Sequence, residues 1–355
     1  MSFFGSNEMY DIVKDILHFS KPLLAVLAGF LLVRKINNPN FFIRVVIYIS
    51  IVFAIKHLIV FGFIDLKRGT IEELRLLAGA GNFIEIIAMT FLIVFSRKKV
   101  LNISLSLKGL MILILGMSIV LYFSRTMLVG FIVLLLSFYG YTILSRKAFE
   151  YTSIGVILIG VLYAYLFAID LNPDKPGIEN FFYKIKNAPA EVFTSPDSYD
   201  RNNHKEIFDQ WRGYEAKMAL REMEGNNFNY VFGKGFGSLI DLGLKAPIGG
   251  ENGLQFIPHI HNGYIYVFFK TGIIGLFLYF MIIANLYKKG YASSKNDEVR
   301  GINRLISGLG VYFFITSFVI TGLYNLEEIS IFIVGCFYAL SQKHSQDSSL
   351  TLTSK

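Results

Sequence analysis

The sequence predicts an all-α polytopic membrane protein with about nine to eleven transmembrane helices and one long extracytoplasmic loop. Hydrophobic residues make up 54% of the 355 residues and charged residues only 17%, which is typical of membrane proteins. The apolar residues gather in runs that meet or approach the roughly 20 residues of a bilayer-spanning helix. These runs are Ile16–Val33, Phe41–Phe63, Leu77–Phe95, Gly109–Phe123, Met127–Leu144, Thr152–Ile169, Gly263–Leu286, Leu305–Leu323 and Ile329–Leu340.

The fourth and fifth runs belong to one continuous stretch, Gly109–Leu144, whose only full charge is Arg125. A single helix of that length would reach about 54 Å, nearly twice the thickness of the hydrocarbon core. The chain therefore has to turn back within the stretch, and the polar group Ser124-Arg125-Thr126 is the place for the turn. This interpretation puts Arg125 at a membrane face.

The basic residues between the runs predict which side each loop faces, because cytoplasmic loops carry an excess of Lys and Arg. One set of loops carries thirteen: Arg34, Lys35, Arg97, Lys98, Lys99, Lys108, Arg146, Lys147, Lys288, Lys289, Lys295, Arg300 and Arg304. The short loops of the other side carry four: Lys67, Arg68, Arg75 and Arg125. The first set is predicted to be cytoplasmic, so Arg125 faces outward. This bias also accounts for the net charge of +8, and no nucleic-acid partner is expected.

Residues 170–262 form the longest polar segment, and this topology puts it outside the cytoplasm. Apolar residues recur there at helical spacing, which predicts an amphipathic helix near the membrane surface. They are Ile207, Phe208, Trp211, Tyr214, Met218 and Met223. Residues 1–169 and 263–340 then form the N-terminal and C-terminal transmembrane helices. The polar residues 341–355 are expected to be a disordered cytoplasmic tail.

The stretch HIHNGYIYVFFKTGIIG, His259–Gly275, differs from a plain anchoring helix because two histidines open it and a lysine and two glycines interrupt it. Projected as a helix, Gly272 and Gly275 lie on the face of His261, and Lys270 lies on the opposite face. The glycines indicate either close helix packing or a groove below the histidine. The lysine indicates either a paired charge inside the bundle or a contact with a substrate phosphate.

Three further residues add to His261 on the outer side. Arg125 is either a residue that extends to the interface or an anion-binding residue. Arg212 precedes Glu215 by three residues, which is typical of a surface ion pair. Guanidinium groups also suit bidentate binding of a diphosphate, and a neutral imidazole accepts protons at physiological pH. Together these residues indicate a site for a phosphorylated lipid.

Other chemistries find no motif in the chain. It contains no Asp-x-Asp, no His-Glu-x-x-His and no Walker sequence, so neither a metal ion nor a cofactor is expected. The glycine-rich run Gly233–Gly237 is interpreted as a turn rather than a phosphate loop. Lys56 and Glu85 fall at similar depths in neighbouring predicted helices, which predicts a buried ion pair, with a proton relay as the alternative.

These residues resemble the O-antigen polymerase and O-antigen ligase superfamily of bacterial envelope glycosyltransferases. Three motifs carry the resemblance: His261-Asn262 with Gly272-x-x-Gly275, Ser124-Arg125, and Trp211-Arg212-Gly213-Tyr214-Glu215 with Phe232-Gly233-Lys234-Gly235-Phe236-Gly237. Their order and topology are similar to those of the family from about Gly109 to Gly275. The first hundred residues contribute only hydrophobicity to the resemblance.

The resemblance implies a metal-independent, inverting glycosyltransferase with a multi-helix membrane fold similar to the GT-C class. Its donor would be a glycan on undecaprenyl diphosphate, presented at the outer leaflet of the bacterial inner membrane, with the active site facing the periplasm. Arg125 and Arg212 would neutralise the diphosphate as the glycosidic bond breaks. His261 would be the general base for the acceptor hydroxyl, with Glu215 as the rival base.

The resemblance also implies a set of substrate contacts around the base. Asn262 would orient the acceptor hydroxyl, and Tyr264 would contact the substrate. The groove at Gly272 and Gly275 would admit the lipid stem.

Three activities fit these residues. A polymerase transfers the growing glycan to another lipid-linked repeat unit, a ligase transfers it to lipid A–core, and a polytopic glycan or lipid transporter does no chemistry. The Arg-Gly-Tyr-Glu and His-Asn-Gly-Tyr blocks are more similar to polymerases. Expected partners are the lipid-linked donor and acceptor, with a flippase and a chain-length regulator as further candidates.

Overall fold

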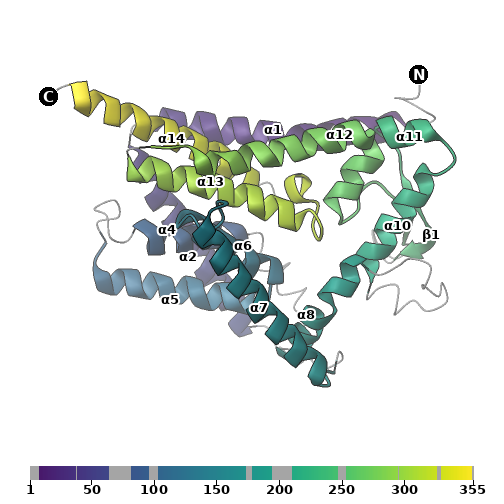
Figure 1. Ribbon diagram of the computed structural model, residues 1–355, viewed down its shortest axis with the longest axis horizontal. Coiled ribbons are helices and arrows are strands. Elements are labelled where there is room, and N and C mark those ends of the chain that lie inside the picture. The colour runs from purple at the N-terminus through teal and green to yellow at the C-terminus, as the bar shows by residue number, and fades with distance from the viewer. Residues whose placement is uncertain are drawn as a thin grey trace. The chain divides into compact units, whose positions relative to one another are not determined.

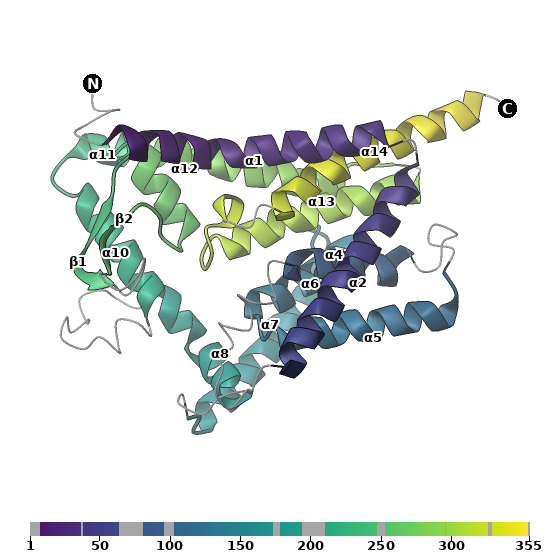
Figure 2. The ribbon, with the colours of Figure 1, turned by 180° about the vertical axis from the view of Figure 1, so that it is seen from behind.

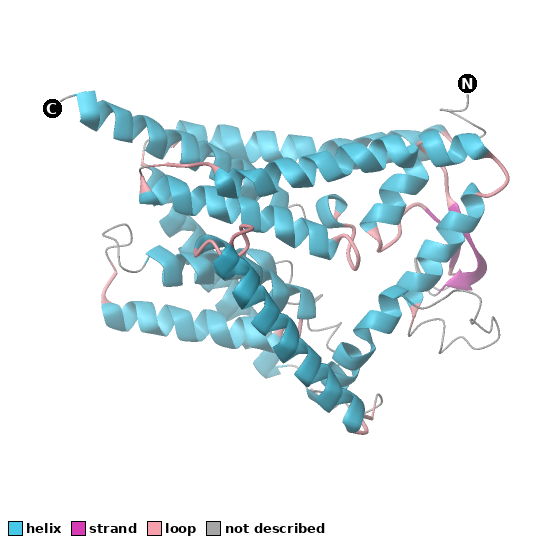
Figure 3. Ribbon diagram, viewed as in Figure 1, coloured by secondary structure: helices cyan, strands magenta, loops and turns pink. Residues whose placement is uncertain are grey.

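The computed structural model of the protein consists almost entirely of helices (Figures 1 and 3). It describes residues 8–36, 38–63, 81–95, 103–172, 178–193, 210–246, 253–294, 296–325 and 329–353. The longer helices are α1 (Met9–Lys35), α2 (Pro39–Phe63), α4 (Asn82–Val94), α5 (Leu105–Leu121), α6 (Arg125–Phe138), α7 (Arg146–Ala168), α8 (Ile178–Phe193), α10 (Trp211–Met223), α12 (Gly263–Lys288), α13 (Asp297–Thr316) and α14 (Ile329–Thr353). The short elements are α11 (Asn227–Phe232), η3 (Lys289–Tyr291), η4 (Gly322–Tyr324), β1 (Ile240–Ala246) and β2 (Leu254–Ile257).

Four helices in the described part of the chain are long and apolar enough to cross a membrane: Met9–Lys35, Asn40–Phe63, Phe149–Ala168 and Gly263–Tyr291. Four shorter ones are also apolar: Asn82–Val94, Leu105–Leu121, Arg125–Phe138 and Ile329–Lys343. Each predicted apolar run overlaps a helix. The eighth overlaps α13, which begins earlier than predicted, with the charged residues Asp297 and Glu298. The number of spans and the side that each loop faces remain predictions.

Contacts within the chain divide it into two compact units. The first unit comprises Met1–Pro22, Ile154–Asn285 and Phe313–Leu326, and the second comprises Leu23–Ser153, Leu286–Tyr312 and Glu327–Lys355. The division inside α1 falls at Pro22, where a proline ring removes a backbone donor from the helix interior. Each unit therefore joins segments that are far apart in the sequence.

The second unit is a bundle in which α2, α4 and α5 pack against one another and α4 also contacts α6 and α14. Its centre is apolar, with Ile86, Phe91 and Leu115 completely or almost completely buried. The second part of α1 crosses α14 closely. A Cβ atom on Gly29 or Gly335 would overlap a backbone carbonyl of the facing helix, which is the close approach that small residues permit in membrane bundles.

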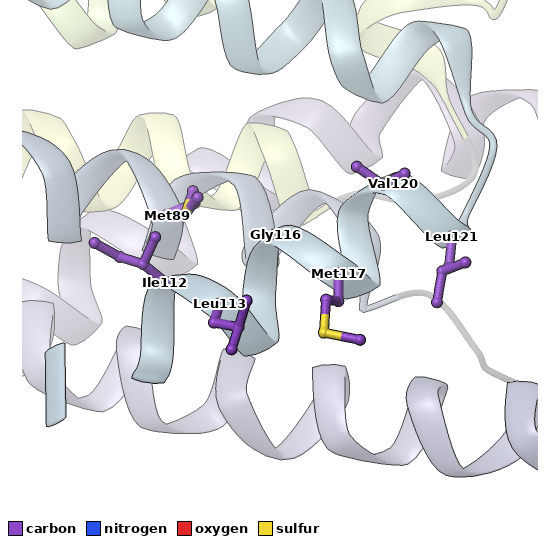
Figure 4. Close-up of a pocket in the computed structure, with 7 residues that line it drawn as sticks. All are labelled: Met89, Ile112, Leu113, Gly116, Met117, Val120 and Leu121. Atoms are coloured by element: carbon purple, nitrogen blue, oxygen red, sulfur yellow. The ribbon is translucent and has the colours of Figure 1, made fainter. Parts of the chain in front are cut away.

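An apolar hollow of about 560 Å³ lies on α4 and α5 of the same unit (Figure 4). Its lining residues are Met89, Ile112, Leu113, Gly116, Met117, Val120 and Leu121. None of these side chains carries a charge or a hydrogen-bonding group. The hollow therefore suits hydrocarbon and offers nothing that would bind a phosphate or a sugar.

The predicted ion pair between Lys56 and Glu85 is wrong. Glu85 is completely buried in α4, whereas Lys56 is exposed on α2. The next residue, His57, is the one that turns into the bundle, and its Nδ1 lies 2.8 Å from Ser118 Oγ of α5. Because neighbouring positions differ by about 100° around a helix, equal depth in the membrane did not place Lys56 on the correct face.

The first unit contains a two-stranded antiparallel sheet, which the all-α prediction missed. Ile240 pairs with Ile257, and Asp241 pairs with Phe256. Figures 1 and 2 show the strands beside α10, and Tyr214 Oη of α10 donates a hydrogen bond to the carbonyl of Leu242 at 2.6 Å. The signal was present as two short apolar stretches around the glycine-rich segment at residues 247–253, which is typical of a hairpin.

Two helical segments go beyond the sequence prediction. In the first unit, α8 follows α7 and is tied to it, because Tyr163 Oη donates to the carbonyl of Ile185 at 3.0 Å. In the second unit, α14 continues to Thr353, through the residues expected to form a disordered tail. Ser341 Oγ donates to Asn303 Oδ1 at 2.8 Å, so the polar extension begins with a contact that holds it in the helix.

Candidate active site

The predicted amphipathic helix of the outer segment is α10, which carries Arg212 and Glu215 in the first unit. Its buried face consists of Tyr214, Glu215, Met218, Ala219 and Met223. The predicted apolar stripe is thus confirmed over this helix, while Ile207 and Phe208 lie outside the described residues. The buried face includes one carboxylate among apolar neighbours, which is costly unless the carboxylate finds donors.

The donors come from His261. Glu215 Oε2 lies 2.7 Å from His261 Nδ1 and 2.9 Å from the backbone nitrogen of the same residue. The Glu215 side chain is only 2% exposed, whereas the His261 side chain is 48% exposed. One end of the imidazole is therefore fixed to a buried carboxylate, and the other end is accessible.

This geometry determines which nitrogen of His261 is available for chemistry. An ionised carboxylate only accepts hydrogen bonds, so Nδ1 carries a proton in this pair, an assignment made from the hydrogen-bond network. Nε2 then holds the free lone pair. A carboxylate that orients an imidazole through Nδ1 also stabilises the imidazolium that forms when Nε2 takes a proton. The two predicted rival bases are thus hydrogen-bonded to each other, and His261 is the one whose side chain is exposed.

The backbone at His261 is fixed from the other side by the segment that follows α13. The N–H of Thr321 donates to the carbonyl of His261 at 2.9 Å, and the N–H of Gly263 donates to the carbonyl of Ser317 at 2.7 Å. The structure starts α12 at Gly263, so His261 precedes the helix. The helical projection of the whole stretch from His259 is therefore wrong at its first turn.

The neighbouring His259 has a different environment. Its Nδ1 lies 3.0 Å from Tyr266 Oη, and its ring centroid lies 4.4 Å from that of His18 of α1. Burial, with a smaller contribution from His18 and nearby lysines, lowers the pKa of His259 to about 3. His259 is therefore neutral at physiological pH and is a packing residue, in contrast to His261.

The glycines of α12 do not clear a groove for a ligand. Gly272 interrupts the helix with φ 65° and ψ −164°, a backbone region that is essentially restricted to glycine. A Cβ atom there would overlap the carbonyl of Val231 in α11, and a Cβ on Gly275 would overlap Thr271. The space is filled by protein, so close packing is the correct alternative and the predicted lipid groove is wrong.

The glycine-rich run after α11 satisfies the carbonyl groups that the interruption of α12 leaves free. The N–H of Lys234 donates to the carbonyl of Phe269 at 2.7 Å, and the N–H of Gly235 donates to that of Lys270 at 3.2 Å. Orphan carbonyls at a helix end need such donors. The interpretation as a turn rather than a phosphate loop is confirmed, since these N–H groups are already used.

Lys270 is a buried charge in an ion pair. This was one of the two alternatives that the sequence left open. Its Nζ bonds to Asp15 Oδ2 of α1 and to the carbonyl of Ser238 at 2.6 Å. Asp15 Oδ2 also accepts from the N–H of Gly237 at 2.7 Å. Asp15 lies in the part of the chain where the sequence indicated only hydrophobicity, and it ties α1 to the segment that caps α12.

Two of the predicted substrate contacts, Asn262 and Tyr264, also make structural hydrogen bonds. Asn262 Oδ1 accepts from the N–H groups of Tyr264 and Ile265, both at 3.1 Å, so Asn262 is the N-cap of α12. The side chain of Tyr264 is buried, and its Oη donates to the carbonyl of Phe314 at 2.7 Å.

The two predicted diphosphate ligands belong to different units. Arg212 is half-buried on α10, one turn before Glu215, in the same unit as His261. Arg125 is half-buried and is the first residue of α6, in the second unit, so the predicted turn in the apolar stretch is confirmed. The described residues contain no group of three or more His, Cys, Asp or Glu that could hold a metal ion.

A half-exposed histidine that a buried carboxylate orients has the geometry that a general base requires. Residues 109–280 match the family described as O-antigen ligase. This match covers 172 of the 355 residues and supports the resemblance to the O-antigen polymerase and ligase superfamily, whose members are glycosyltransferase-like enzymes. The matched residues include Arg125, Arg212, Glu215 and His261. Comparison with curated proteins and with solved structures gave no match.

Proposed function

We propose that the protein is a polymerase that transfers a growing glycan from undecaprenyl diphosphate to a sugar hydroxyl of another lipid-linked repeat unit. The match of residues 109–280 to the family described as O-antigen ligase supports glycan transfer. The Arg-Gly-Tyr-Glu block at Arg212–Glu215 and the His-Asn-Gly-Tyr block at His261–Tyr264 support the polymerase over the ligase. The reaction takes place at the periplasmic face of the inner membrane and needs no metal ion.

In the proposed step, the acceptor hydroxyl oxygen forms a bond to the anomeric carbon of the donor while the bond from that carbon to the diphosphate oxygen breaks. His261 Nε2 takes the hydroxyl proton, and the electron pair of the broken bond leaves on the lipid diphosphate. Attack from the face opposite the leaving group inverts the anomeric configuration. Arg212 and Arg125 balance the charge that develops on the diphosphate.

The observation that carries this proposal is the contact between Glu215 and His261 Nδ1 at 2.7 Å. It gives Nε2 the lone pair and leaves it accessible, which a general base requires. A carboxylate with 2% exposure is a poor base for a sugar hydroxyl, because it is enclosed and already accepts two hydrogen bonds. Glu215 is therefore assigned to orienting His261.

The test is extension of a purified undecaprenyl-diphosphate-linked repeat unit by the purified full-length protein, with EDTA present and product length measured on gels. We expect long products from the wild-type protein and none from His261→Gln, with both proteins retaining undecaprenyl diphosphate. Glu222→Gln is the control. Glu222 lies on α10, the helix that carries Glu215, and pairs with Lys234 at 3.7 Å at the surface. Normal extension by His261→Gln would contradict the base assignment.

Ligation is the second candidate, because the matched family is described as O-antigen ligase. The same assay separates the two when lipid A–core is offered as an additional acceptor. Transfer to lipid A–core without extension would make the protein a ligase. Movement of the lipid-linked glycan across a vesicle membrane without any transfer, unaffected by His261→Gln, would make it a transporter.

The proposed orientation is tested by cysteine labelling in intact cells with a reagent that does not cross the membrane. The one native cysteine, Cys336, is buried. We expect labelling of a cysteine introduced at Ser195, in the outer segment, and none at Asn102, in a loop predicted to be cytoplasmic. The reverse pattern would overturn the orientation.

A further inference from the structure

The turn between α5 and α6 in the second unit contains a strained residue. Phe123 has φ 47° and, among the described residues, is the only non-glycine residue with a positive φ. A bulky side chain in this region costs about 1–3 kcal/mol and persists only where the surroundings impose it. Phe123 stands two residues before Arg125, the first residue of α6.

Buried polar side chains hold the residue that precedes Phe123. The ring of Tyr122 stacks on the ring of His57 of α2, with centroids 3.7 Å apart and planes 20° apart. Tyr122 Oη donates to Glu85 Oε1 of α4 at 3.5 Å. Tyr122 and its two partners are each at most 1% exposed.

Ser118, one turn earlier on α5, joins the same group. Its Oγ lies 2.8 Å from His57 Nδ1. The donors and acceptors are consistent when His57 Nδ1–H donates to Ser118 and the hydroxyl of Tyr122 donates to Glu85. The network of these four residues thus links α2, α4 and α5 through two hydrogen bonds and one pair of stacked rings.

Such a network is an expensive way to fill the centre of an apolar bundle, where apolar side chains would pack at lower cost. Its particular effect is directional. Stacking fixes the plane of the Tyr122 ring, and the contact with Glu85 fixes its long axis. With Tyr122 held in this way, the chain has little freedom over Phe123 and Ser124 before α6 begins.

We propose that His57, Glu85, Ser118 and Tyr122 are positioning residues that fix Arg125 for the diphosphate of the lipid-linked substrate. They act through the backbone of the turn, and their own side chains stay sealed inside the unit. The inference rests on the proposed function, in which Arg125 is a diphosphate ligand. It assigns a task to α2 and α4, which lie outside the residues that match the family.

The experiment measures binding of undecaprenyl diphosphate to the purified full-length protein in lipid nanodiscs. Tyr122→Phe and Glu85→Gln are compared singly and in the Arg125→Ala background. We expect each single variant to weaken binding about three- to tenfold, as residues of one coupled network do. Neither should weaken binding further once Arg125 is absent.

Ser50→Ala is the matched control for loss of a buried polar contact in the same helices. Ser50 Oγ lies 2.9 Å from the carbonyl of Ile84 and does not belong to the network. This variant should lower the thermal unfolding midpoint and leave the dissociation constant unchanged. Tyr122→Phe keeps the stacked ring and removes a single oxygen, so it answers the question even if Glu85→Gln does not fold.

The outcomes separate this inference from the proposed function. Equal losses of affinity with and without Arg125 would show that the network acts elsewhere, and would overturn the inference while the function stands. If Arg125→Ala binds undecaprenyl diphosphate as tightly as the wild type, Arg125 leaves the proposed site and the inference falls with it.

Discussion

The two units each contain a histidine and a buried glutamate, but the two groups differ in access. In the first unit, Glu215 contacts His261 directly and the imidazole is about half exposed. In the second unit, His57 and Glu85 are both completely buried, and Ser118 and Tyr122 stand between them. Both groups contain a histidine and a glutamate, but the histidine of the first is half exposed and that of the second is buried.

The comparison shows that access, rather than residue type, separates a reacting group from a positioning group. A general base has to come within hydrogen-bond distance of a substrate proton, and only His261 offers a free nitrogen at an accessible surface. His57 and Glu85 are buried, so they can act only on the protein around them, by fixing helices and the turn between them. The predictions that follow test this division, beginning with the largest effect.

The first prediction sets His261→Ala against His57→Ala. Loss of a general base should lower turnover by about 10²–10⁴-fold, with little change in binding of undecaprenyl diphosphate, because the diphosphate does not contact the base. His57→Ala should lower the unfolding midpoint and weaken binding while turnover of the bound substrate persists. Extension rates and thermal unfolding of both variants decide this. Similar kinetic defects with similar stability would break the comparison.

The second prediction asks whether the buried ion pair of the first unit, Lys270 with Asp15, contributes to stability. Lys270→Met leaves Asp15 buried without its charge partner and should cost about 3–5 kcal/mol of stability. The double variant Asp15→Leu with Lys270→Met should cost less than either single change, since apolar replacements of a buried pair are often tolerated. The measurement is the unfolding midpoint in detergent. Additive losses would show that the two charges do not depend on each other.

The third prediction compares the two glutamates. Glu215→Gln keeps an oxygen that accepts from His261 but removes the charge that stabilises the imidazolium, so turnover should fall about 10- to 100-fold. Glu85→Gln should leave turnover of the bound substrate unchanged and weaken binding of undecaprenyl diphosphate. Saturation kinetics separate the two effects. A loss of turnover by Glu85→Gln equal to that of Glu215→Gln would remove the distinction between the regions.

The sequence was sufficient for most helices because an apolar run of bilayer length rarely forms any structure but a spanning helix. It also placed the turn before Arg125, where a charge interrupts a stretch too long for one span. Glu215 and His261 could both be named in advance. Their contact could not, because Glu215 and His261 are 46 positions apart and an amphipathic stripe does not identify which polar residue is enclosed.

The errors have local physical causes. The projection of α12 assumed one regular helix, whereas the N-cap at Asn262 and the interruption at Gly272 change which residues share a face. Asp15 and Lys270 are 255 positions apart, beyond any pattern in a local window. The wrong pairing of Lys56 with Glu85 came from using depth alone, without the direction of each side chain around its helix.

The last prediction concerns the extent of the reacting region, meaning the residues that contact the substrate. It tests whether this region includes Asn262, the residue after His261. Asn262 was expected to orient the acceptor, but its side chain caps α12, as that of Asn226 caps α11 through the N–H of Phe228 at 3.0 Å. Loss of such a cap costs about 1 kcal/mol, whereas serine is nearly as good a cap as asparagine. Asn262→Ala and Asn226→Ala should therefore lose similar stability, and Asn262→Ser should extend glycan at close to the wild-type rate. The measurements are unfolding midpoints and extension rates of the three variants. If Asn262→Ser folds normally but extends poorly, the amide itself contacts the substrate, and the reacting region includes the first residue of the cap.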